Sequence, residues 1–424
     1  MIFPEMAVFR QELVSMPIKD AAGAAYEQLR LSASGLAELS GSSVAVAVGS
    51  RRIDRIDEVV AGVLRFLKEL GTRPFIVAAM GSHGGASAEG QKALLAGYGI
   101  TGQSLGVPVV AGMDTAVIGH TQAGMPLYVS KEALAADHVV AVNRIKPHTK
   151  FCADIESGLC KMLAVGLGNA DSAAACHRFA LRHSFSLIES AAASILQSLS
   201  VPVAVGLIED GHGMLSQIHA VPGSEMIENE KQMLRSAYSM LAKIPFEKID
   251  VLVVDRIGKD ISGIGMDSNV TGRHRDITGD FFIPPDPARI FVRDLSEGSD
   301  GNANGIGLAD ITTSRLVSRI DREKTAVNAI TAISPEKAAV PLHFQTDKKC
   351  LETCIYTAGI QNASEAGIVR IRDTASLEFI EISRALENRA PAGTEMKRVT
   401  PWRGWVFDSS DNLFDFYPGE QNAV

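Results

Sequence analysis

The chain has 424 residues, 46% of them hydrophobic, and a formal net charge of −8. This length exceeds that of most single cores and the composition is typical of globular proteins, so two domains are expected. The acidic balance, with no basic stripe, argues against nucleic acid or an anionic membrane as the main partner.

The sequence also predicts where the protein works. No apolar stretch approaches the roughly 18 to 20 residues of a membrane span, and the N-terminus lacks the pattern of a signal peptide. The five cysteines are odd in number and irregular in spacing. A reduced, cytoplasmic setting is therefore expected.

Short apolar runs alternate with amphipathic stretches along the first half of the chain. Strands, some running into loops, are predicted at 43–50, 74–85, 137–148 and 201–210, and helical segments at 55–71, 87–99, 173–199 and 228–248. Strands rich in Val, Ile and Ala that alternate with helices are typical of an α/β fold with a mostly parallel sheet. Helices are then expected on both faces of that sheet.

A second set of strands follows a predicted domain boundary near residue 246. These strands are expected at 249–258, 289–295, 367–373 and 377–383. We therefore expect an N-terminal domain at 1–245 and a smaller C-terminal α/β domain at 246–424.

Four glycine-containing loops lie at the ends of predicted strands. They are GSRR (49–52), GSHGG (81–85), NRIKPH (143–148) and IGKDISGIGMDSN (257–269). Ligands of open parallel sheets bind outside the carboxyl ends of the strands. Glycines there let backbone N–H groups approach an anion, so a phosphate or carboxylate ligand is expected.

Several side chains in and after these loops could carry chemistry. One loop histidine most often satisfies a backbone carbonyl, but His83 and His148, at two strand ends of one predicted sheet, favour a function. Lys161 lies in the apolar run GLCKMLAV, where a lysine is rare unless it is paired or reactive, or snorkels from a helix end. The imidazole of His177 suits Ni, Zn or Cu, as would the thiol of Cys176.

These motifs, in this order, resemble the nickel-dependent lactate racemase superfamily of 2-hydroxyacid racemases and epimerases, as a divergent branch. GSRR is similar to the family's first arginine loop, GSHGG to its Gly-Thr-His segment, and KPH with SGLCK to its Pro-His and Ser-Gly-Gly-x-Lys segment. His177 follows Lys161 by sixteen residues, the family's spacing for its metal histidine. His148 and Lys161 lie thirteen residues apart, a longer interval than is usual in the family, which predicts a substrate other than lactate.

The resemblance implies a role for each matching position. His83 and His148 would be the acid/base pair at the substrate hydroxyl, and His177 would be the protein ligand to nickel. The cofactor would be a nickel-pincer nucleotide, a pyridinium-3,5-dithiocarboxylate-type mononucleotide that holds the metal. Its binding would involve Lys161 as the anchor, with Arg51, Ser82, Gly84 and Ser157. The substrate would contact Arg52, Lys259 and Arg273, in a cleft between the cofactor-binding domain and a C-terminal domain that closes on the substrate.

The implied chemistry explains why these parts occur together. Breaking the α C–H bond of a hydroxy acid is beyond a positioned histidine alone, which contributes about 10²- to 10⁴-fold. A cofactor that accepts hydride removes this difficulty, and two histidines then handle the hydroxyl proton for the two enantiomers. A racemase or epimerase of a small 2-hydroxy acid is therefore predicted, with sugar acids among the candidates. Two alternatives stay open: a metal-dependent lyase or dehydratase of a hydroxy acid, and a non-catalytic organic-acid binding protein.

Overall fold

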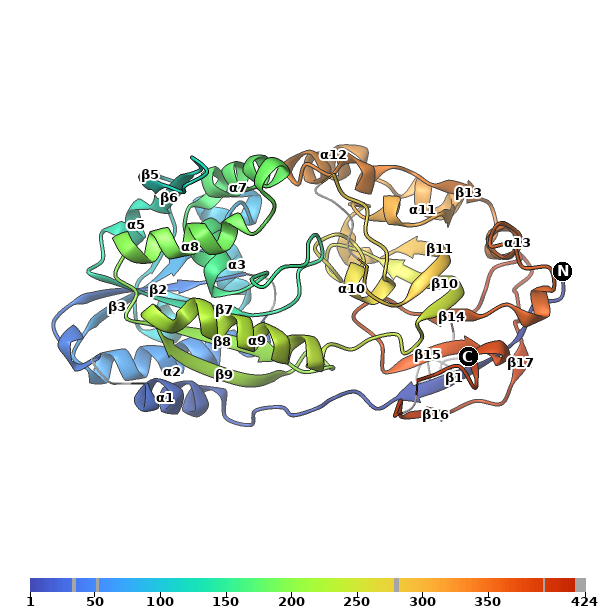
Figure 1. The fold of residues 1–424 in the computed structure, drawn as a ribbon, viewed down its shortest axis with the longest axis horizontal. Coiled ribbons are helices and arrows are strands. Elements are labelled where there is room, and N and C mark those ends of the chain that lie inside the picture. Colours follow the sequence, from blue (N-terminus) through green and yellow to red (C-terminus); the bar gives the residue numbers. More distant parts are fainter. Residues whose placement is uncertain (33–35, 51–52, 278–281, 392, 416–424) are drawn as a thin grey trace. The chain divides into compact units, whose positions relative to one another are not determined.

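The protein consists of two compact units. The computed structural model describes residues 1–32, 36–50, 53–277, 282–391 and 393–415. The N-unit is Val14–Leu241, and the C-unit combines Met1–Leu13 with Ala242–Val424 (Figure 1). The predicted domains, 1–245 and 246–424, place the first thirteen residues in the N-terminal domain, whereas in the structure these residues belong to the C-unit. They belong to the C-unit because β1 (Glu5–Gln11) pairs antiparallel with strands near the opposite end of the chain.

The N-unit is built on a six-stranded sheet. Its strands are β2 (Ser43–Val48), β3 (Arg73–Ala78), β4 (Val109–Val110), β7 (His138–Arg144), β8 (Val203–Glu209) and β9 (Leu215–Pro222). They lie in the order β4-β3-β2-β7-β8-β9, and all neighbours are parallel except β8 and β9. A separate hairpin joins β5 (Thr115–His120) to β6 (Pro126–Ser130). The predicted mostly parallel sheet is confirmed.

The sheet of the N-unit is buried on both faces, as its apolar strands predict. In β2, Ala45 and Ala47 pack into one core, while Val44, Val46 and Val48 pack into the core on the opposite face. This alternation follows from the two-residue period of a strand. Burial on both sides accounts for the continuous apolar run that the sequence shows.

Helices cover the two faces of this sheet in separate sets (Figure 1). The core on one face includes residues of α1 (Ala21–Leu31), α2 (Ile56–Glu69) and α3 (Ala88–Gly97). The core on the other face includes residues of α5 (Lys131–Leu134), α6 (Leu159–Lys161), α7 (Asn169–His183), α8 (Leu187–Ser198) and α9 (Met226–Met240). A short helix, α4 (Gly102–Leu105), precedes β4.

The helical segment predicted at 173–199 is two helices rather than one. The helix α7 ends at His183, and Ser184 adopts a left-handed backbone conformation with φ 58° before α8 begins at Leu187. A left-handed residue interrupts the α-helical hydrogen-bond ladder. Phe185 lies in this break and is buried.

The C-unit contains a larger, mixed sheet. Its strands, besides β1, are β10 (Lys248–Ile257), β11 (Asp286–Leu295), β12 (Ile311–Thr313), β13 (Leu342–Phe344), β14 (Ile368–Ile371), β15 (Phe379–Ser383), β16 (Met396–Arg398) and β17 (Arg403–Gly404). The order is β13-β12-β11-β10-β14-β15-β1-β16, with β17 also paired to β1. Strands β10 to β14 run parallel, and β15, β1, β16 and β17 add antiparallel pairs. Its helices are α10 (Ser268–Thr271), α11 (Ser314–Ser318), α12 (Arg322–Thr331) and α13 (Asp347–Thr357).

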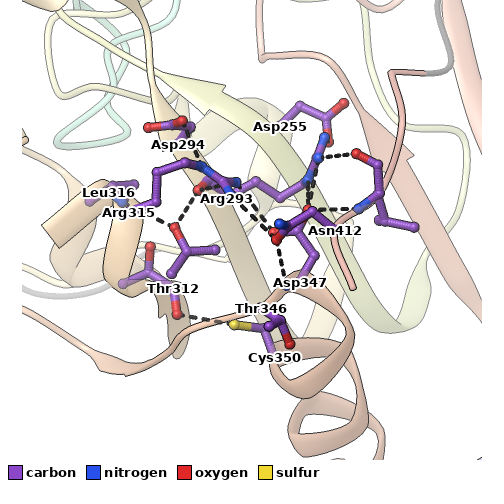
Figure 2. Close-up of polar contacts among 12 residues, drawn as sticks. Asp255, Arg293, Asp294, Thr312, Arg315, Leu316, Thr346, Asp347, Cys350 and Asn412 are labelled. Atoms are coloured by element: carbon purple, nitrogen blue, oxygen red, sulfur yellow. Dashed lines mark hydrogen bonds and ion pairs between the residues drawn. The ribbon is translucent and has the colours of Figure 1, made fainter. Parts of the chain in front are cut away.

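A buried network of ion pairs joins this sheet to the segment around Leu413 (Figure 2). Arg370 binds Asp255 through two hydrogen bonds of 2.9 Å, and Arg293 contacts both Asp255 at 3.0 Å and Asp347 at 2.8 Å. The backbone N–H of Leu413 donates to Asp347 at 3.0 Å, and its carbonyl accepts from Arg293 at 2.7 Å. The charges of the C-unit core are therefore paired with one another.

Over the residues that the structure describes, no helix combines the length and hydropathy needed to cross a membrane.

Candidate functional site

The carboxyl ends of β2, β3 and β7 lie side by side in the N-unit sheet. Val48 is paired with Ala78 of β3 on one side and with Val142 of β7 on the other. From β2 the chain proceeds through β3 and β4 in one direction, whereas β7 and β8 lie in the other. The strand order thus reverses between β2 and β7, and such a point is where open α/β sheets bind ligands. The loops that carry His83 and His148 leave the sheet at this edge.

Glycine is required in the loop after β3 that contains His83. Gly81 and Gly84 have φ values of 62° and 68°, and a Cβ atom on Gly84 would lie 2.6 Å from the backbone N of Gln91. The Nδ1 atom of His83 is hydrogen-bonded to the hydroxyl of Ser50, at the end of β2. Two neighbouring strand ends are therefore connected through the His83 ring. Ser82 and Gly84, predicted cofactor contacts, lie half-buried in this loop.

The ring of His148 is fixed from two directions in the loop after β7. Its Nδ1 atom accepts a hydrogen bond of 3.0 Å from the backbone N–H of Lys150, and its ring stacks on Phe151 with centroids 4.3 Å apart. Because Nδ1 accepts, the neutral ring carries its proton on Nε2. In the neutral ring, Nε2 of His148 is thus the proton donor.

A buried carboxylate closes the loop that carries His148. Glu156 accepts hydrogen bonds from the backbone N–H of His148 at 2.5 Å and of Ala153 at 3.1 Å. The hydroxyl of Tyr238, on α9, donates to the same carboxylate at 2.9 Å. Burial raises the pKa of Glu156 despite these donors, which lower it. Neither Glu156 nor Tyr238 was singled out from the sequence, because the contact between them spans 82 residues.

The turn that carries Lys161 is held by a second buried carboxylate, which lies on α9, the helix that also carries Tyr238. Glu230 of α9 accepts a hydrogen bond of 2.7 Å from the backbone N–H of Cys160, at the start of α6. A Cβ atom on Gly158 would lie 2.0 Å from a carboxylate oxygen of Glu230, so a larger residue there would displace this carboxylate. Burial raises the pKa of Glu230 to about 7. A π-helical turn, Met162–Gly166, follows Lys161, and its Gly166 carbonyl accepts from Gly81 at 3.1 Å.

An aromatic pair lies among the predicted functional groups. Phe151 and Phe185 stack with ring centroids 4.1 Å apart. The ammonium group of Lys161 lies 5.9 Å from the Phe151 centroid, and the His177 ring meets Phe185 edge-on at 6.2 Å. With His148 stacked on Phe151, three residues predicted from separate motifs surround one pair of rings. The aromatic pair itself was not predicted, since Phe185 gave no signal beyond its hydrophobicity.

The thiols of Cys160 and Cys176 and the hydroxyl of Ser157 are buried polar groups near these residues. Burial raises the pKa of Cys176 to about 11 and that of Cys160 well above its usual value, so both thiols stay protonated near neutral pH. The Ser157 hydroxyl is buried, and no hydrogen-bond partner for it occurs among the described residues. A buried polar atom of this kind fits a position that contacts a ligand.

These groups fit the cofactor that the resemblance implies. An amine at Lys161 suits covalent or ionic attachment, a buried hydroxyl at Ser157 offers a hydrogen bond, and the imidazole of His177 suits nickel. Within the described ranges, no three His, Cys, Asp or Glu side chains are grouped so as to hold a metal ion by themselves.

The remaining predicted residues lie elsewhere. Arg51 and Arg52 fall outside the described residues. Lys259 and Arg273 belong to the C-unit, where the Lys259 ammonium donates to the Gly263 carbonyl at 2.7 Å, and Arg273 pairs with Asp310. A substrate contact of either residue stays a prediction.

Comparison with known proteins identifies the part of the chain that carries these residues. Residues 31–187, which include His83, His148, Lys161 and His177, match the family model described as lactate racemase N-terminal domain. The structure is similar to that of the lactate racemase apoprotein from Thermoanaerobacterium thermosaccharolyticum, with a TM-score of 0.53 and 14% sequence identity. This similarity covers 87% of the present chain and 94% of the other, and it confirms the predicted α/β fold class. None of the curated proteins matches the chain.

Proposed function

We propose that this chain, whose residues 31–187 match the lactate racemase N-terminal domain model, is a member of the lactate racemase superfamily that inverts the α-carbon of a 2-hydroxy acid by hydride transfer to a nickel-pincer nucleotide. The observation that carries this proposal is the gathering of His148, Lys161 and His177 around the Phe151–Phe185 pair. Such a set combines a proton-transfer group, an amine for attachment and a metal ligand at one pair of aromatic rings.

The two histidines would move the hydroxyl proton. His83 is hydrogen-bonded through Nδ1 to Ser50, and His148 accepts at Nδ1 from Lys150, so Nε2 would be the atom of each ring that handles the substrate proton. One ring would accept the proton of the substrate hydroxyl as the 2-keto acid forms, and the other ring would donate a proton to the same oxygen when the 2-keto acid is reduced again. The roles would exchange for the opposite enantiomer, since the reaction runs in both directions.

The other residues would bind and orient. Lys161 would anchor the cofactor, His177 would coordinate nickel, and Ser157, Ser82 and Gly84 would hydrogen-bond to the nucleotide. The cofactor, when bound, would supply a hydride acceptor that acid–base groups cannot replace. Arg51 or Arg52 would hold a carboxylate or phosphate, for which a guanidinium is suited. Closure of the C-unit on the substrate, through Lys259 or Arg273, is part of the same proposal.

Isotope retention tests this mechanism directly. The protein would be purified from a host that makes the cofactor, and its nickel content and intact mass determined. Single enantiomers of 2-hydroxy acids carrying deuterium at the α-carbon would then be supplied. We expect about one nickel per chain, and racemic product that keeps the deuterium, because hydride returns to the same carbon. Deuterium lost to water in the inverted product would indicate proton abstraction instead and would contradict the proposal.

A further inference from the structure

Ser50 is a buried serine that contacts one of the two proposed acid/base histidines. Only 8% of its surface is exposed, and its hydroxyl is hydrogen-bonded to Nδ1 of His83. The chain just before it runs close to β7, because a Cβ atom on Gly49 would lie 2.5 Å from Oδ1 of Asn143. The side-chain amide of Asn143 in turn donates to the Gly158 carbonyl at 2.8 Å. Ser50 therefore approaches His83 from a closely packed strand end.

The two histidines are held at Nδ1 by groups of different hydrogen-bonding capacity. His148 accepts from the backbone N–H of Lys150 at 3.0 Å, and an N–H group can only donate. His83 contacts a hydroxyl, which can either donate or accept. The bond made at Nδ1 decides which nitrogen of a neutral imidazole carries the proton. The contact with Lys150 therefore fits one neutral form of His148, whereas Ser50 can hold His83 in either neutral form and as imidazolium.

These forms differ in what the Nε2 atom can do. A neutral ring that carries its proton on Nε2 has no lone pair there to accept another. When Nδ1–H of His83 donates to the oxygen of Ser50, the lone pair of Nε2 is available and the ring can act as a base. After Nε2 has accepted a proton, the same oxygen still accepts from Nδ1–H and favours the charged ring. The hydroxyl of Ser50 thus matches His83 both before and after proton transfer.

We propose that Ser50 is a positioning residue, which accepts a hydrogen bond from Nδ1–H of His83 and so leaves Nε2 to take the proton of the substrate hydroxyl. In that step the substrate O–H bond breaks and an N–H bond forms at Nε2. The oxygen electron pair forms the C=O bond as hydride leaves the α-carbon for the acceptor named in the proposed function, and reduction of the 2-keto acid reverses the step. This inference rests on the proposed function, because it takes His83 as an acid/base residue.

The first test locates the proton on the His83 ring. The full chain would be produced with isotope-labelled histidine in a host that makes the cofactor, and ring-nitrogen NMR would be recorded, with His83→Gln to identify the signals. When the ring is neutral, we expect the proton on Nδ1 in wild type. In Ser50→Ala the proton should shift towards Nε2, because Nδ1 has lost its acceptor. Ser50→Thr, which keeps a hydroxyl, should retain the wild-type form.

Steady-state racemisation provides the second test. Ser50→Ala should lower kcat by about 10- to 100-fold, the range for a hydrogen bond to a charged group, while KM changes less than about twofold. Ser50→Thr should recover most of the rate. Ser200→Ala is the matched control, because the Ser200 hydroxyl makes the same kind of bond, of 2.8 Å, to Nδ1 of His138 at the start of β7. This control should leave kcat, KM and the His83 signals at their wild-type values.

Three results would overturn the proposal. A neutral His83 ring with its proton on Nε2 in wild type would do so, and this measurement needs no variant to fold. An unchanged position of the proton in Ser50→Ala would also refute it. The third result is a fall in kcat that Ser50→Thr does not recover, since Ser50 would then act through packing alone.

Failure of the proposed function gives a different result, because the NMR measurement needs no turnover. The expected shift of the proton in a protein that racemises no 2-hydroxy acid would end the racemase proposal, and the catalytic purpose of Ser50 with it. An unchanged ring in an active racemase would overturn the role of Ser50 and leave the proposed function intact.

Discussion

The two units hold buried charge in opposite ways. In the C-unit, burial alone would raise the pKa of Asp255, but Arg370 and Arg293 hold it below its usual value. In the N-unit, the buried carboxylates Glu156 and Glu230 face backbone N–H groups and a hydroxyl, and burial raises the pKa of each. Matched charges stay ionised and specify a fixed arrangement, whereas Glu230, which is held by a neutral donor and has its pKa raised to about 7, can change protonation near physiological pH.

This difference in the pairing of buried charges agrees with what the charges of each unit hold in place. The C-unit network joins β10, β11 and β14 to the segment around Leu413 and involves no group of the candidate site. Glu156 and Glu230 hold the backbone at His148 and Cys160, one residue from Lys161. Glu156 contacts α9 through Tyr238, and Glu230 is part of α9. This helix therefore supports both the proton-transfer loop and the turn that would anchor the cofactor.

The largest effect is expected at Lys161. Lys161→Ala should abolish covalent attachment of the cofactor and racemisation, because no other amine occupies that turn, while the melting temperature stays close to that of wild type. Intact mass and nickel content are the measurements. Lys92→Ala, on the exposed face of α3, should keep both at the wild-type level. A Lys161→Ala protein with full activity would remove this residue from the mechanism.

The histidines come next. His83→Ala and His148→Ala should each lower kcat by about 10²- to 10⁴-fold with a small change in KM, the range for loss of a general acid or base. Steady-state racemisation of each enantiomer measures the effect. His183→Ala, at an exposed position near the end of α7, should be neutral. Unchanged kcat in both site variants would show that these rings are structural.

In the C-unit, Asp347→Ala should lower the free energy of unfolding by about 3–5 kcal/mol, because it leaves Arg293 with an uncompensated buried charge. Chemical denaturation followed by circular dichroism gives the value. Lys324→Ala breaks an exposed pair with Asp300 on the same unit and should cost less than about 1 kcal/mol. Similar losses in the two variants would contradict the contrast drawn here.

Glu230 predicts a pH dependence of the N-unit. Its pKa is about 7 in the folded protein and 4.5 without burial, so between these values the folded state binds a proton that the unfolded state has lost. Stability from this group is therefore complete below pH 4.5 and falls as the pH rises through 7. At 1.4 kcal/mol per pKa unit, the loss is about 3 kcal/mol. Glu230→Gln should flatten this part of the profile, and an identical slope in the variant would contradict the assignment.

The smallest effect is expected at Tyr238. Tyr238→Phe removes one donor from Glu156 and should lower the free energy of unfolding by about 1 kcal/mol. Because Glu156 also holds the backbone N–H of His148, kcat should fall a few-fold while KM changes little. Tyr356→Phe, at an exposed position of the C-unit, is the control. A fall in stability without any change in kcat would limit Tyr238 to a structural role.

The sequence by itself determined the sheet of the N-unit and the order of its chemical motifs. The apolar strand 43–48 and the loops that carry His83 and His148 follow from local periodicity and glycine placement, which short segments express without help from the rest of the chain. The resemblance that rests on these motifs assigned Lys161 and His177, and the structure brings both to the same rings as His148.

Only the tertiary structure decided which distant groups support that site. Glu230 meets Cys160 across 70 residues, and Tyr238 meets Glu156 across 82, so neither contact leaves a periodic pattern in the sequence. The break at Ser184 that positions Phe185 has no glycine or proline to announce it. The strand at Glu5–Gln11 pairs with strands more than 360 residues away, as in Met6 with Ser383, and therefore lies in the C-unit. Contacts of this kind depend on how the elements pack, which no local pattern encodes.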